Sequence, residues 1–179
     1  KEIKLPEKSK SISYAGIFAA VCLFISSIES LITGSGFANT LMCLLALAFA
    51  VTLVWYSLAA AGKTEFPAAA SLVGVVYAIT RLFVNFTGYT GEIAVSDSTF
   101  DIVTMCLTLL FLTAMAKQIC SIRTAKVSAA MYGFGLAAVT FCLCAFFPCL
   151  IAIITGNSAN IHGGSLPDAS HIGLAVFIF

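Results

Sequence analysis

Long apolar runs with almost no charge decide what this chain can fold into. A helix needs roughly 20 mostly apolar residues to cross the hydrocarbon core of a bilayer. Only 9% of the residues are charged and 60% are hydrophobic, which leaves too few polar groups to coat a soluble protein. The runs lie at about 13–32, 39–61, 67–86, 99–116, 127–155 and 170–179, the last cut short at Phe179. The sequence therefore predicts an all-α, polytopic membrane helix bundle of six transmembrane helices, with residues 1–179 forming a single transmembrane domain.

The basic residues predict how the bundle is oriented. Threading the six runs in order puts every Lys and Arg except Arg81 on one side of the membrane. The loops on the other side contain neither and carry Glu92, Asp97 and Asp168 instead. By the positive-inside rule the basic side, with the N-terminus, is cytoplasmic, and we expect a multi-pass protein of the cell membrane. All connections are short, so any function must reside in the bundle or in the outer loops.

Polar residues share one face on three of the predicted helices. At 100° per residue, Tyr77, Arg81 and Asn85 line one side of the third helix, together with small residues. Glu29 lies near the outer end of the first helix, and the fourth enters from outside with Asp97, Asp101, Thr104 and Thr108 on one stripe. Charges within a membrane are costly and mark functional sites by default. The predicted ligand-binding residues are Glu29, Tyr77, Arg81, Asn85, Asp97 and Asp101.

The same charges also have a structural interpretation. Arg81 paired with Glu29 or Asp101 would lock the bundle, since each charge compensates the desolvation of the other. Asp101 would serve as a helix-capping residue if Ser98 began the fourth helix, because Ser98 and Asp101 match the capping-box spacing. The sequence leaves both interpretations open.

Other kinds of chemistry find little support. His162, Asp168 and His171 could bind zinc, but their spacing matches no ligand signature, and we predict no metal site. The chain has no phosphate-binding GxxxxGK[ST] loop, no HExxH and no GxSxG. We therefore expect no catalytic residues, no cofactor and no enzyme activity. Nucleic-acid binding has no basis at a net charge of +1.

Small residues four positions apart indicate close helix contacts, as at Ala15/Ala19, Ala46/Ala50 and Gly133/Ala137. The overall plan, with Ala15-Gly-Ile-Phe-Ala19 in the first helix and an outer polar cluster, resembles the substrate-binding subunits of energy-coupling-factor vitamin transporters. Those are small six-helix proteins with an outward-facing pocket, and the resemblance is one of architecture. It favours a small-solute binding or transport component that takes a small polar or charged solute. The alternative is a non-catalytic accessory or scaffold subunit that binds other membrane protein subunits. In either case the lipid bilayer is a partner.

Overall fold

The computed structural model describes residues 10–34, 36–87, 95–120, 125–155 and 169–179, except for the side chains of residues 33, 95–100, 149, 152 and 153. All regular structure in these residues is helical. The elements are α1 (Lys10–Thr33), α2 (Phe37–Ala60), the 3-10 turn η1 (Ala68–Ala70), α3 (Ser71–Thr87), α4 (Val95–Ile119), α5 (Ala125–Ile154) and α6 (Ala169–Ile178). Each α-helix lies on one of the predicted apolar runs, with its ends shifted by a few residues. The predicted all-α architecture is confirmed.

The helices have the length and surface of membrane spans. Among the described residues, five helical segments are long and apolar enough to cross a bilayer: α1, α2, the combined η1–α3 segment, α4 and α5. Helix α6 is a shorter apolar helix. Large apolar side chains such as Phe24, Ile79 and Leu136 are exposed on the outside of the bundle. In water such a surface would aggregate, whereas in lipid it needs no cover. The chain is an integral membrane protein.

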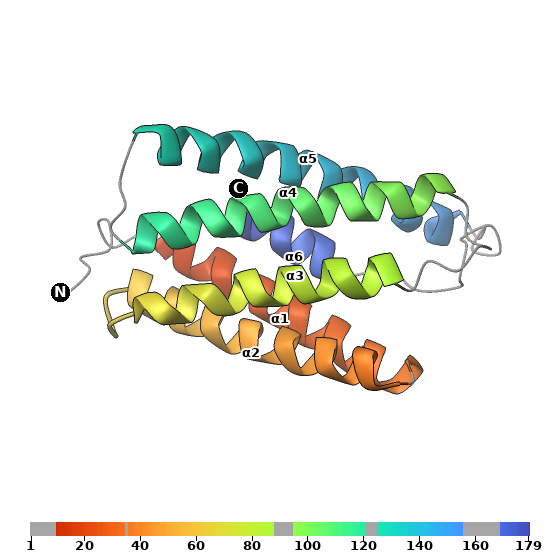
Figure 1. Cartoon of the computed structure of the whole chain (residues 1–179), viewed down its shortest axis with the longest axis horizontal. Helices are drawn as coiled ribbons and strands as arrows, with labels where there is room; N and C mark the ends of the chain where they lie inside the picture. The colour runs from red at the N-terminus through yellow and green to blue at the C-terminus, as the bar shows by residue number, and fades with distance from the viewer. Residues whose placement is uncertain (1–9, 35, 88–94, 121–124, 156–168) are drawn as a thin grey trace.

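The contacts between the helices close a ring, and Figure 1 shows the bundle from the side. Each packs against the one that follows it in the chain, and α6 also packs against α1. Successive helices run in opposite directions, so α1, α3 and α5 begin at one end of the bundle, which we call the inner end. Lys10, Lys63, Lys117 and Lys126 all lie at this inner end, by their positions at helix starts and finishes. That the inner end faces the cytoplasm stays a prediction.

The turns at the two ends have clear local causes. At the inner end, α2 stops in a Schellman motif: Gly62 takes φ +74°, its N–H donates to Ala59 O, and the N–H of Lys63 donates to Leu58 O. At the outer end, Asn39 fastens the start of α2 to the end of α1. Its Nδ2 donates to Ser30 O at 2.8 Å, and its Oδ1 accepts from Ser30 Oγ at 2.9 Å.

The main apolar core lies about midway along the helices. One cluster joins α1, α2, α3, α4 and α6; its larger members are Leu23, Phe49, Leu53, Tyr77, Phe111, Leu112 and Leu174. Ala46 and Ala50 are buried in the same cluster, and Ala19 contacts Gly173 of α6. These small residues therefore make contacts within the chain. Gly133, by contrast, is exposed, with no heavy atom near the position of a Cβ.

Helix α6 begins deeper in the bundle than the outer end of α1. Its Gly173 lies against Ala19 and Cys22 of α1, and α1 then continues to Thr33, whereas α6 reaches back only to Ala169. At a rise of about 1.5 Å per residue, α6 begins roughly 10–15 Å short of the outer end of α1. The first residues of α6 therefore lie well below the outer end of the bundle.

Candidate functional site

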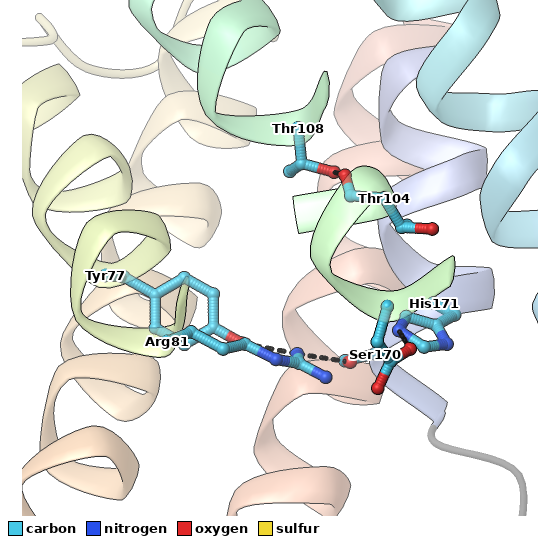
Figure 2. A network of polar contacts seen from close by, with 7 residues as sticks. Tyr77, Arg81, Thr104, Thr108, Ser170 and His171 are labelled. Atoms are coloured by element: carbon cyan, nitrogen blue, oxygen red, sulfur yellow. Dashed lines mark hydrogen bonds and ion pairs between the residues drawn. The ribbon is translucent and has the colours of Figure 1, made fainter. Parts of the chain in front are cut away.

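Arg81 is the centre of a polar cluster in the outer half of the ring. Its side chain is only 8% exposed. Its Nη1 donates to Tyr77 Oη at 2.8 Å and to Ser170 Oγ at 2.7 Å (Figure 2). Tyr77 lies one turn earlier on the same face of α3, so this contact follows from the i, i+4 spacing. Ser170 comes from α6, which stands opposite α3 in the ring, so the second bond crosses the bundle.

Helix packing brings Ser170 within reach of Arg81. Gly173 has no side chain, which allows α6 to lie directly on the Ala19 backbone of α1. Ser170 is one turn before Gly173 on the same face of α6 and is fully buried. The close contact of α6 with α1 therefore holds the hydroxyl that accepts from Arg81.

A second contact joins α6 to α4. Nε2 of His171 lies 3.8 Å from Oδ1 of Asp101, a distance that fits an ion pair when the imidazole is protonated. His171 is buried, whereas the Asp101 side chain is about half exposed. The carboxylate of Asp101 is thus the more accessible partner of the pair.

The face of α4 that continues inward from Asp101 is buried and polar. Thr104 and Thr108 are nearly inaccessible, and Thr108 Oγ1 donates to Thr104 O at 2.9 Å. A threonine that bonds to the carbonyl four residues earlier satisfies its hydroxyl within its own helix. Figure 2 shows these two residues beside the contacts of Arg81 and His171, so α3, α4 and α6 together line the cluster.

Four of the predicted site residues lie in the outer parts of their helices. Arg81 and Asp101 are each six residues from the outer end of their helices, which is about 9 Å. Glu29 and Asn85 are half-buried and lie about 3–6 Å from the outer ends of α1 and α3 by the same rise. All four residues are thus within about 9 Å of the outer ends of their helices, and their joint role in binding a ligand stays a prediction. The side chain of Asp97 lies outside the described residues.

The structure also corrects the capping interpretation of Asp101. Helix α4 begins at Val95, so Ser98 lies within the helix and cannot be its N-cap. Pairing of Arg81 with Glu29 or Asp101 stays a prediction. Of the histidines and the carboxylate considered for zinc, His162 and Asp168 lie outside the described residues; within the described part of the chain, no group of three potential ligands forms.

Sequence reasoning did not assign Ser170 and His171 to the site. Both stand at the start of a short apolar helix whose depth the sequence does not specify. A usable signal was present, because Ser170 and Gly173 are small residues that share one face of a largely apolar segment. Such a face packs against another helix.

The fold and the cluster define a class: a polytopic membrane helix bundle with a buried polar cluster in its outer half. Comparison with models of known families, with curated proteins and with solved structures gave no match.

Proposed function

We propose that this protein is a small-solute binding or transport component of the cell membrane, with its polar site opening toward the outer end of the bundle. The observation that carries the proposal is the burial of Arg81. Removing a guanidinium from water costs several kcal/mol even in a favourable protein environment, and an uncharged side chain could fill the same space. A charge kept at that cost in a membrane helix favours a binding role.

The chemistry of the cluster indicates the kind of solute. A guanidinium presents donors in a planar fork that matches a carboxylate or phosphate group. The carboxylate of Asp101 on α4 is suited to a cationic group on the same molecule, and Glu29 supplies a second carboxylate from α1, on the opposite side of the ring. A small polar solute carrying at least one anionic group fits this set, and no cofactor or catalytic step is needed.

A second candidate function is that of an accessory or scaffold subunit without a solute. It is favoured by the bond between Arg81 and Ser170, which ties opposite helices of the ring and would serve equally well as a structural lock. The two candidates differ in what the charge is for, and so in what its removal does.

Native mass spectrometry of the full chain, gently solubilised from its host membrane, tests the proposal. A small molecule released at modest collision energy supports binding and gives its class. Stoichiometric partner polypeptides without a small molecule support the accessory role instead.

The double variant Arg81→Met with Glu29→Gln then tests the site itself. A binding site predicts a folded protein that no longer retains the molecule, whereas normal retention shows that the site is elsewhere. Lys63→Met with Glu65→Gln is the matched control, because it makes the same change in charge on exposed residues at the inner end. It should leave retention unchanged.

A further inference from the structure

An apolar layer lies directly beneath the polar cluster. Tyr77 is one turn inward of Arg81 on α3, and its ring belongs to the main apolar cluster. Phe49, Leu53, Phe111, Leu112 and Leu174 complete this layer, and each is at most 5% exposed. The polar residues of the site are therefore separated from the inner end by packed side chains from α2, α3, α4 and α6.

The aromatic pair Phe49 and Tyr77 is the part of this layer that touches the site. Their ring centroids are 5.4 Å apart with an interplanar angle of 26°, an offset stack. The hydroxyl of Tyr77 accepts from Arg81, so the outer edge of the stack is part of the polar cluster. The other ring belongs to Phe49 of α2, and it reaches across to α3, the neighbouring helix.

Gly74 makes this stack possible. An ideal Cβ at Gly74 would lie 2.6 Å from Cε2 of Phe49 and 3.1 Å from its Cδ2. Any side chain at this position would push the ring away from α3. Because Gly74 precedes Tyr77 by three residues, the two present one face, and Phe49 covers both.

We propose that the Phe49–Tyr77 stack is the floor of the site, closing it toward the inner end. Water and solute reach Arg81 from the outer half and stop at the two rings. Passage through the bundle would require α2 and α3 to move apart at this point. As a gate in transport, the floor rests on the proposed function, but its role as a barrier can be measured without knowing the solute.

The experiment uses the full chain reconstituted in liposomes loaded with the pH-sensitive dye pyranine. A pH step is imposed with potassium and valinomycin present, so that proton flux is not limited by membrane potential. Wild-type protein should dissipate the step no faster than empty liposomes. Phe49→Ala, which removes one ring and leaves a polar cluster above a void, should dissipate it several-fold faster.

Two further variants sharpen the test. Gly74→Ala keeps the Phe49 ring but displaces it, and it should also leak if the position of the ring matters. It also provides a second route if Phe49→Ala does not fold. Phe66→Ala is the matched control, because Phe66 is also a buried phenylalanine but belongs to a separate cluster with Ala59 and Ile119 near the inner end. It should stay tight. Size-exclusion elution and helical circular dichroism establish that each variant is folded.

The outcomes separate the floor from the proposed function. Folded Phe49→Ala and Gly74→Ala proteins that remain as tight as wild type overturn the floor, and so does a Phe66→Ala protein that leaks as much as Phe49→Ala. Leak in the floor variants, combined with normal retention of the small molecule by the Arg81 and Glu29 double variant, supports the floor and overturns the binding site proposed above it.

Discussion

Replacing Gly173 by alanine should weaken the packing of α6 on α1. An ideal Cβ on Gly173 would lie 2.6 Å from Cβ of Cys22 and 3.3 Å from both Cα and the carbonyl oxygen of Ala19. Carbon atoms in contact are normally about 3.5–4.0 Å apart, so the helices would have to separate by roughly 1 Å. None of these atoms is the end of a flexible side chain, so no change of rotamer relieves the clash. Overpacking of this kind destabilises by about 1–3 kcal/mol.

Gly133→Ala is the matched control for this prediction. It adds the same methyl group to a helix, but the Gly133 position is exposed and has no atom within 4 Å of the new Cβ. Alanine in a helix interior is favoured over glycine by about 0.5–1 kcal/mol, so this variant should be slightly more stable than wild type. The two variants should therefore shift stability in opposite directions.

Equilibrium unfolding in mixed micelles, with SDS titrated into dodecylmaltoside and helicity followed by circular dichroism, measures both effects. Cys22→Gly removes the Cβ that clashes and should recover part of the loss in a double-mutant cycle with Gly173→Ala. Equal stability changes at Gly173 and Gly133, or no coupling between Cys22 and Gly173, would contradict the packing argument and the placement of α6 that follows from it.

Three other predictions concern local contacts and orientation. Ser170→Ala removes an acceptor for Arg81 and should cost about 1.5–3 kcal/mol in the same unfolding assay, since the bond involves a charge. Ser27→Ala is the control and should cost clearly less, because Ser27 is also buried but donates to the carbonyl four residues back in its own helix. Equal losses would argue against a special role for the cross-ring bond. Gly36→Ala should destabilise the protein by about 1–3 kcal/mol, because φ +114° suits only glycine. The cost comes from the backbone alone, since no atom lies within 4 Å of the position of the new Cβ. An unchanged unfolding midpoint would show that the turn relaxes. Fusion reporters should place the N-terminus in the cytoplasm, and alkaline phosphatase inserted at Gly36 should be active; activity after insertion in the 62–65 turn instead would reverse the orientation.

The pattern of apolar residues was sufficient to predict the fold class. Each span is a run of apolar residues long enough to cross a bilayer, and in lipid only a helix or a closed barrel satisfies the backbone hydrogen bonds. The turn at Gly62 is similarly local, because a left-handed residue at the end of a helix favours glycine. Tyr77 and Arg81 were predicted to act together because four residues of a helix separate them. These features depend on neighbours in the sequence, so the sequence alone determines them.

The partners across the ring were decided by the tertiary structure. Ser170 is 89 residues from Arg81, and its place depends on how deeply α6 enters the bundle. That depth is set by the close contact of Gly173 with α1, where the side chains of one helix meet the backbone of another. Phe49 lies over Tyr77 for the same reason, since Gly74 leaves room for its ring. Helix periodicity specifies which face a residue occupies, but only packing between helices specifies which face it meets and at what depth.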